Sequence, residues 1–261
     1  MAECEDGKVK GVCSANVKKW DTNFFGKKVA AIEMLCAGGD YFESLAEKEK
    51  LLNKFGEWRK KNEVKVATAR YSDLDLSSIH SLEKNGFTFM ENLVTFTIPK
   101  NPDLKPANSV RQARASDEER VAEISRNAFS YDRFHSDAHI DNKLADELYA
   151  QWARNSIKKI AAQEVFVHEK SSKIDGFITC KITEVKPLKV SEGVIELFAV
   201  DQKVKGSGAA EELLKSALAW FSSNCDVIHV GTQSKNVRAM RFYEKNGFRA
   251  VCSQTTLHAW F

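Results

Sequence analysis

The hexapeptide LEKNGF at residues 82–87 recurs as YEKNGF at residues 243–248, 161 positions further along the chain. In each copy a helix-like pattern leads into the Asn-Gly pair and an alternating apolar run follows it, as expected where a glycine ends a helix and a strand begins. The same shift of 161 positions brings residues 66–87 onto residues 227–248 without a gap. The sequence therefore predicts a duplicated strand–helix–strand unit, with two independent helix ends of the same type as the alternative.

The two copies differ at the positions that carry polar or reactive groups. Tyr243 stands where the first copy has Leu82, and Asn236 stands where it has Asp75. The second copy also follows the glycine-bearing stretch 206–208, whereas the equivalent stretch of the first, around position 45, contains no glycine. We therefore expect the first half to keep the packing residues of the unit and to lack its chemistry.

The composition is that of an ordinary soluble globular protein. Hydrophobic residues make up 43% of the 261 residues and charged residues 29%, and the formal net charge of +3 is too near neutral to indicate a nucleic-acid partner. No apolar run approaches the length of a membrane span, and the polar, acidic N-terminus does not resemble a signal peptide. The six cysteines are scattered and have no spacing typical of a metal site, so reduced thiols, no metal and a cytoplasmic location are expected.

Strand and helix patterns alternate along the chain, and one stretch interrupts them. Residues 99–109 hold three of the four prolines, several turn formers and no long apolar run, which is typical of a linker. We therefore predict two domains, residues 1–104 and residues 105–261. The alternation of strands and helices favours an α/β fold.

A glycine-bearing turn leads from a predicted strand into a predicted helix, with the sequence Lys203-Val204-Lys205-Gly206-Ser207-Gly208. Unpaired N–H groups and the helix dipole make such a helix start attractive to anions, and glycines let those N–H groups converge. A diphosphate is the ligand that this pattern favours, and tight packing of a helix start is the alternative. The stretch is neither a P-loop nor a full dinucleotide fingerprint, because no Gly-Lys-Ser/Thr follows and residue 211 is a glutamate.

Three motifs together resemble the GCN5-related N-acetyltransferase (GNAT) superfamily. They are Lys203-x-x-Gly206-x-Gly208, then Asn236 followed seven residues later by Tyr243, then Asn246-Gly247-Phe248. Lys203 departs from the family pattern, in which Gln or Arg is usual. The resemblance covers residues 108–261 and implies a mixed central sheet flanked by helices, with a degenerate GNAT-like half at residues 1–104.

The resemblance also implies that acyl-CoA, carrying an acetyl or a longer hydroxyacyl group, is the co-substrate. Backbone groups of the strand before the loop would bind the pantetheine arm, and N–H groups of the loop and the helix start would bind the pyrophosphate. The implied CoA-binding residues are Phe198, Ala199, Val200, Lys203, Lys205, Gly206, Ser207, Gly208, Ala209, Asn236 and Tyr243.

Acyl transfer from a thioester requires an acid near the sulfur and a base near the amine. A phenol with a pKa near 10 can hydrogen-bond or protonate a departing thiolate, so Tyr243 is the predicted acid, with a buried packing role as the alternative. Glu196 is the predicted base, acting directly or through water, and a structural carboxylate is its alternative. His135, Asp137 and His139 are further candidates.

The acceptor is suggested by a second resemblance. Trp20-x-x-x-Phe24-Phe25-Gly26, an Arg133-Phe134 loop and a Tyr149-x-x-Trp152 helix resemble the TDP-fucosamine acetyltransferase-like nucleotide-sugar N-acyltransferases. That family implies N-acylation of a dTDP-linked amino-dideoxy sugar, in lipopolysaccharide or O-antigen synthesis. The implied acceptor contacts are Tyr131, Arg133, Phe134, His135, Asp137, Tyr149 and Trp152.

Core packing is the alternative for Tyr149 and Trp152, which lie three apart on one helix face. A protein or peptide N-acetyltransferase shares the CoA site and is the competing activity, and a non-catalytic acyl-CoA sensor is the competing class. The sequence leaves open the position of the amine, the acyl length and the oligomeric state, a homodimer included.

Overall fold

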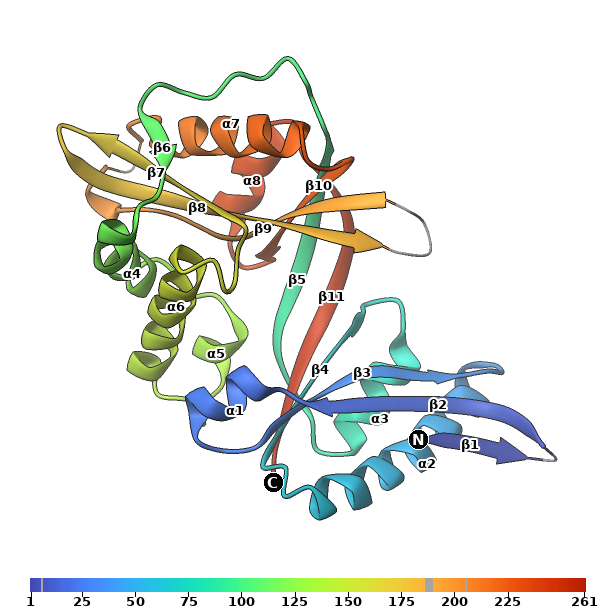
Figure 1. Ribbon diagram of the computed structural model, residues 1–261. Helices are drawn as coiled ribbons and strands as arrows, with labels where there is room; N and C mark the ends of the chain where they lie inside the picture. The colour runs from blue at the N-terminus through green and yellow to red at the C-terminus, as the bar shows by residue number, and fades with distance from the viewer. Residues whose placement is uncertain (6, 186–189, 205) are drawn as a thin grey trace. The chain divides into compact units, whose positions relative to one another are not determined.

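The computed structural model describes residues 1–5, 7–185, 190–204 and 206–261. The chain forms two compact units (Figure 1). The first contains Met1–Leu93 together with Cys252–Phe261, and the second contains Val94–Val251. Each unit is a β-sheet flanked by helices.

In the first unit the sheet order is β1-β2-β3-β4-β11, with β3 and β4 parallel and the other neighbours antiparallel. The helices α2 and α3 supply Leu51, Leu52, Phe55 and Leu82 to its core. The elements of this unit are β1 (Ala2–Glu5), β2 (Lys8–Val17), α1 (Lys19–Phe25), β3 (Val29–Ala37), α2 (Tyr41–Lys61), β4 (Val66–Ser72), α3 (Leu76–Lys84), the beginning of β5 (Thr88–Pro99) and the end of β11 (Arg249–Trp260).

In the second unit the sheet order is β5-β10-β9-β8-β7-β6, with β9 and β10 parallel. Its core is built by Phe96, Phe221, Tyr243 and Phe248 among others. The remaining elements are β6 (Val110–Gln112), the 3₁₀ turn η1 (Ala115–Asp117), α4 (Glu118–Arg126), α5 (Arg133–Ser136), α6 (Asn142–Ile157), β7 (Glu164–Lys170), β8 (Lys173–Val185), β9 (Val190–Val200), the 3₁₀ turn η2 (Gln202–Val204), α7 (Ala209–Ser222), β10 (Val227–Gln233) and α8 (Val237–Lys245).

The strand–helix–strand repeat predicted from the two hexapeptides is confirmed. The shift of 161 positions carries β4 onto β10, α3 onto α8 and the start of β5 onto the start of β11. The details agree as well: Asp75 accepts a hydrogen bond from the Ser78 N–H at 3.1 Å, and Asn236 accepts one from Ala239 at 3.2 Å. The glycines that end the two helices both have left-handed backbones, with φ of 84° and 88°.

The helices before the repeated strands show where the two halves differ. At the same shift α2 and α7 end together, at Lys61 and Ser222, but α2 has 21 residues and α7 has 14. The extra turns of α2 therefore stand where the second unit has its glycine loop. Asp40 and Glu43 form a capping box at the start of α2, so side chains already satisfy backbone N–H groups there.

In the first unit the residue that corresponds to Asn236 is Asp75, and its carboxylate is bound to a lysine. The buried ammonium of Lys48 lies 2.8 Å from Asp75 and 2.8 Å from the hydroxyl of Ser77. A buried lysine requires such partners because an unpaired charge is costly to bury. The first unit thus uses polar groups internally at a place where the second unit leaves a pocket.

The two units exchange their last strands. The second half of β5, from Val94, belongs to the second unit, where the Thr97 hydroxyl donates to the Ile228 carbonyl at 3.2 Å. The second half of β11, from Cys252, belongs to the first unit, where it pairs with β4 from Gln254↔Ser72 to Trp260↔Val66. The predicted boundary between residues 104 and 105 therefore differs from the division into compact units, because each unit takes one strand from the other half of the sequence.

Candidate active site

The pocket that holds most of the predicted CoA-binding residues opens where β9 and β10 stop pairing. Their parallel ladder runs from Val227↔Glu192 to Val230↔Ile195. Beyond Ile195, β9 is irregular in its register with β8, and the Thr179 hydroxyl accepts from the Leu197 N–H at 2.9 Å. The last residues of β9 stay paired with β8 on one side, and their other edge borders the pocket.

This pocket has a volume of about 410 Å³ and lies wholly in the second unit. It is bordered by the end of β9, the loop after η2, the first turn of α7 and one face of α8. The lining residues are Ala128, Tyr131, Phe198, Ala199, Val200, Gln202, Val204, Gly206, Gly208, Ala209, Ala210, Glu211, Asn236, Arg238, Ala239, Phe242 and Tyr243.

The start of α7 has the geometry of an anion site. Gly206 and Gly208 have φ of 86° and 90°, left-handed values that side chains oppose, and Gly208 is the N-cap. A glycine cap supplies no side-chain acceptor, so the N–H groups of Ala210 and Glu211 in the first turn are available to a ligand. The helix dipole adds positive potential there. This arrangement suits a diphosphate.

Two predicted loop residues, Lys203 and Ser207, do not line the pocket. Lys203 is exposed, and its N–H donates to Asp201 at 2.9 Å. Ser207 is also outside the lining, and its hydroxyl lies 3.4 Å from the Ala209 N–H. Lys205 lies outside the described residues.

Arg238 is a lining residue that the sequence reasoning missed. It occupies the first turn of α8, where no acidic residue stands. Its guanidinium adds a positive charge to the pocket lining, which would favour an anionic ligand. A basic residue two positions after Asn236 was the available signal in the sequence.

Asn236 serves first as the N-cap of α8. Its Oδ1 accepts from the Ala239 N–H at 3.2 Å, and the residue lines the pocket. The cap uses the side-chain oxygen and leaves the amide Nδ2 as a donor. Asn236 is thereby held in a fixed orientation toward any ligand in the pocket.

Tyr243 lines the pocket from within the core of the second unit. Its ring lies 5.9 Å from that of Phe96, 5.6 Å from that of Phe242 and 5.6 Å from that of Phe248. Burial raises the pKa of the phenol well above its usual value of about 10. The hydroxyl is therefore protonated throughout the physiological range and can act as a hydrogen-bond donor.

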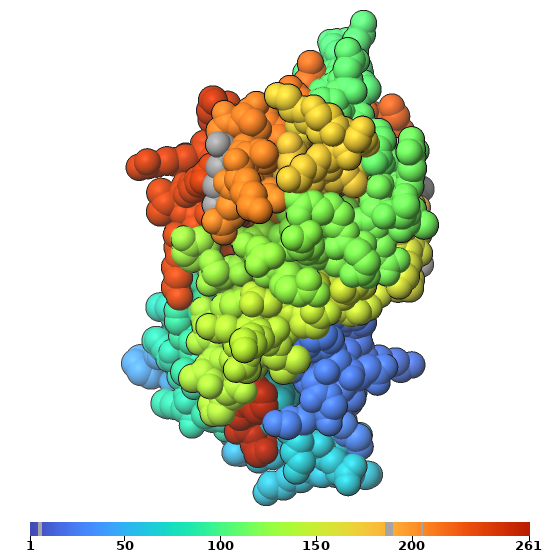
Figure 2. Space-filling model, turned by 90° about the vertical axis from the view of Figure 1, so that its left-hand side faces the viewer, coloured from blue at the N-terminus to red at the C-terminus, as the bar shows by residue number. Residues whose placement is uncertain are grey.

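The predicted acceptor segment forms a helical layer over one face of the second unit. Figure 2 shows α4 to α6, in green to yellow-green, beside the orange segment that leads into α7. Of the seven predicted acceptor residues, only Tyr131 lines the pocket, and its side chain is exposed. The buried ring of Tyr149 stacks on Phe129 at 4.4 Å and lies 6.1 Å from Trp152. Phe134 is buried as well, with the Arg133 guanidinium over its ring at 4.5 Å.

His135 is held between two carboxylates of this layer. Its Nδ1 lies 2.6 Å from Asp132 and its Nε2 lies 3.1 Å from Asp146. The hydrogen bond to Asp132 is the main cause of a raised pKa for the imidazole, and partial burial opposes it. His135 therefore favours the protonated form, which suits a structural ion pair better than a general base.

The other predicted bases are also engaged. The Glu196 carboxylate lies on β9, 3.0 Å from the Lys181 ammonium, and is not part of the pocket lining. Asp137 is buried and accepts from the His139 N–H at 3.0 Å. Glu196 precedes the lining residue Phe198 by two positions on β9.

The sequence of the second unit matches a known family. Residues 120–248 match the model of the Acetyltransferase (GNAT) family. This match confirms the predicted superfamily for residues 120–248, which form a GCN5-related N-acetyltransferase domain, and the mixed sheet flanked by helices confirms the predicted fold. The family uses acyl-CoA as co-substrate.

Similarity extends over nearly the whole chain. The chain is 24% identical over 260 residues to the spore coat polysaccharide biosynthesis protein SpsD of Bacillus subtilis (strain 168), with 98% of this chain and 86% of SpsD covered. A GCN5-related N-acetyltransferase from Kribbella flavida superposes with a TM-score of 0.62 at 12% identity, covering 97% of this chain and 88% of the other. A tandem GNAT protein from the clavulanic acid biosynthesis pathway gives a TM-score of 0.61 at 11% identity, covering 98% and 81%.

No helix among the described residues is both long enough and apolar enough to cross a lipid bilayer.

Proposed function

We propose that the protein transfers an acyl group from acyl-CoA to the amino group of a dTDP-linked amino-dideoxy sugar. The observation that carries the proposal is the meeting, in one pocket, of a glycine-started helix, the Asn236 cap and the Tyr243 phenol. The first half, which replaces its glycine loop with helical turns, is proposed to be a degenerate GNAT-like domain that binds no CoA.

In this proposal the pyrophosphate, the pantetheine arm and the thioester of CoA occupy different parts of the pocket. N–H groups of the first turn of α7 would hold the pyrophosphate, with Arg238 as an additional cation. The pantetheine arm would run along Phe198–Val200 and hydrogen-bond the edge of β9 that faces away from β8. The thioester would then lie toward Asn236 and Tyr243.

Tyr243 would act on the departing sulfur. The acceptor amine attacks the thioester carbonyl, a C–N bond forms, the C–S bond breaks and a thiolate leaves. A phenol is already a weaker acid than a thiol with a pKa near 8.5, and burial raises the pKa of Tyr243 further. Tyr243 therefore stabilises the thiolate by donating a hydrogen bond more readily than by giving up its proton. The amine proton would pass to water or to Glu196.

A sugar acceptor is supported by the relative whose name places it in polysaccharide biosynthesis. The exposed ring of Tyr131 at the pocket could stack on a sugar face or on thymine. Arg133 would pair with phosphate oxygens. We place the reaction in the cytoplasm, because all six cysteines are free, as in a reducing compartment.

The test is an assay of free CoA release with a panel of dTDP-amino sugars, using acetyl-CoA and a hydroxybutanoyl-CoA as donors. Release that depends on a dTDP-amino sugar supports the proposal. Release with a peptide amine and none with any sugar would replace it with a protein or peptide N-acetyltransferase. CoA binding without release toward either acceptor would indicate an acyl-CoA sensor.

A further inference from the structure

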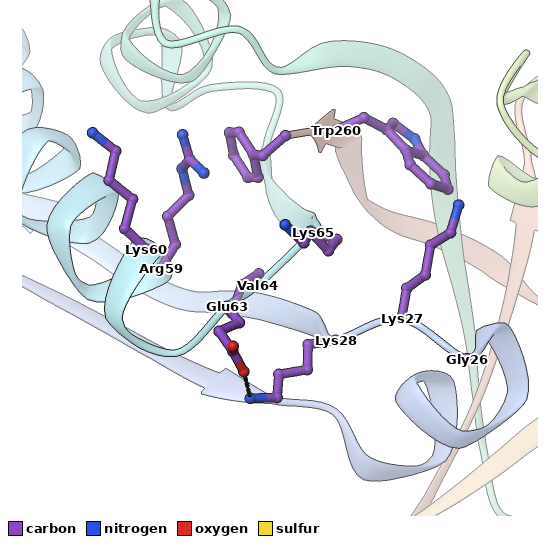
Figure 3. A pocket seen from close by; sticks show the side chains of 10 residues that line it. Gly26, Lys27, Lys28, Arg59, Lys60, Glu63, Val64, Lys65 and Trp260 are labelled. Carbon is purple, nitrogen blue, oxygen red and sulfur yellow. Dashed lines mark hydrogen bonds and ion pairs between the residues drawn. The ribbon is translucent and has the colours of Figure 1, made fainter.

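A second hollow, of about 700 Å³, lies in the first unit (Figure 3). It shares no lining residue with the pocket of the second unit. Three separate segments build it: the turn between α1 and β3, the end of α2 with the turn after it, and the end of β11. The lining residues are Gly26, Lys27, Lys28, Arg59, Lys60, Glu63, Val64, Lys65, Trp260 and Phe261.

The lining is strongly cationic. Five of its side chains are basic, and Glu63 is the one acid. Glu63 is already occupied, because its carboxylate lies 2.7 Å from the Lys28 ammonium, the contact dashed in Figure 3. Within the described part of the chain, no carboxylate makes an ion pair with Lys27, Arg59, Lys60 or Lys65.

Helix ends account for only part of this charge. The C-termini of α1 and α2 both border the hollow, and each carries roughly half a negative charge that nearby cations stabilise. Five cations against Glu63 and the two helix ends leave an excess of positive charge in the hollow. A surface that serves only to complement helix dipoles would not require this excess.

Two aromatic rings complete the walls. The Lys27 ammonium lies 5.2 Å from the Trp260 ring centre, and the Arg59 guanidinium stacks 3.7 Å from the Phe261 ring. The sheet holds the backbone of both residues, since Trp260 pairs with Val66 and the Phe261 N–H donates to the Lys65 carbonyl at 2.9 Å. The cations and the rings therefore line the hollow from adjacent segments of the same unit.

We propose that this hollow binds the diphosphate group of a small anionic ligand such as a nucleoside diphosphate. A ligand of two or more negative charges matches the uncompensated charge, and lysine and arginine are the side chains that bind phosphate oxygens. A concave site favours a small molecule over an extended polymer. The inference goes beyond the proposed acyl transfer and does not depend on it.

The test must separate this site from the glycine loop of α7. The full chain is first saturated with CoA, and thymidine diphosphate and pyrophosphate are then titrated by calorimetry. The double variant Lys27→Ala, Lys65→Ala should weaken binding by about tenfold or more, because each lysine contributes a charge-assisted contact. Glu63→Gln should strengthen binding, because it removes the opposing charge.

Lys84→Ala is the matched control, since Lys84 is an exposed lysine of the same unit that pairs with Glu49 outside the hollow. It should leave binding unchanged. Thymidine diphosphate binding more tightly than pyrophosphate would assign a nucleoside to the rings, whereas equal affinity would assign the diphosphate alone. Binding that is equal in the wild type and the double variant, or a decathymidylate that displaces the diphosphate at lower concentration, would overturn the proposal.

Discussion

The ring of Phe96 lies 5.9 Å from the ring of Tyr243, although the two residues come from opposite halves of the sequence. Phe96 is fully buried in the core of the second unit. The proposed catalytic phenol is therefore held by a strand that precedes the proline-rich stretch 99–109. A fragment that begins after this stretch lacks Phe96 and its packing against the Tyr243 ring.

Two fragments test the strand exchange. Residues 94–251 contain the whole second unit and should unfold cooperatively in urea. Residues 105–261 lack the second half of β5 and carry an unpaired strand at 252–261, so we expect aggregation or no cooperative transition. Chemical denaturation followed by circular dichroism compares them, and a stable 105–261 fragment that binds CoA would contradict the prediction.

Tyr243→Phe keeps the packed ring and removes only the hydroxyl. We expect kcat to fall by about one to three orders of magnitude, with the free energy of unfolding little changed. Since burial raises the phenol pKa, the wild-type kcat should show no loss from phenol ionisation up to pH 10. Steady-state kinetics on a dTDP-amino sugar measures both.

Tyr71→Phe is the matched control for Tyr243→Phe. Tyr71 is a tyrosine of the first unit whose buried hydroxyl has no hydrogen-bond partner among the described residues. Removing this hydroxyl should leave kcat unchanged and should leave the free energy of unfolding unchanged or slightly higher. Equal turnover in the Tyr243 variant and the control would remove Tyr243 from the mechanism.

Gly208→Ala should weaken acyl-CoA binding. The backbone at Gly208 has φ of 90°, so a side chain there costs about 1–2 kcal/mol or forces the loop to change shape. A changed loop misdirects the N–H groups of α7, and we expect KM for acyl-CoA to rise about tenfold. Initial-rate kinetics at varied acyl-CoA gives the value.

Gly86→Ala separates the effect on binding from backbone strain. Gly86 has φ of 84°, also faces open space and ends α3 in the first unit. Both variants should lose similar stability, but only Gly208→Ala should change KM. A KM change of the same size in both would show that the loop has no specific role.

The ion pair of His135 with Asp132 makes stability depend on pH. The folded-state pKa of His135 is raised, so its stabilising contribution is fully present below the unfolded pKa near 6.5 and is lost as pH rises through the folded value. We expect the Tm difference between wild type and His135→Gln to shrink as pH rises from 6 to 9. A constant difference over this range would mean that His135 is neutral when folded.

The proposed CoA site was accessible to sequence reasoning because its parts are local. Gly206 and Gly208 determine how the chain enters a helix, and Asn236 caps the next helix, where Tyr243 lies two turns on. Such features depend on near neighbours in the sequence. Lys203 shows the limit of this reasoning, since its charge indicated a phosphate contact and the folded loop turns it outside the lining.

Features that depend on distant partners were not accessible. The alternating patterns at 87–98 and 249–260 identify strands, but alternation does not say which strand lies beside them. The exchange of β5 and β11 and the basic hollow both depend on such pairings. Tyr149 is a third example, because its aromatic character suggested a ligand and its burial against Phe129 is a matter of tertiary packing.

The exchange of strands also affects how the chain is made. The first unit needs Leu257 and Ala259 for its core, yet these residues follow the rest of that unit by more than 160 positions. At roughly 5–20 residues per second, the ribosome takes on the order of 10–30 s to reach them from Leu93. During this interval the edge of β4 is exposed, so a chaperone that shields strand edges during translation would raise the yield of folded protein.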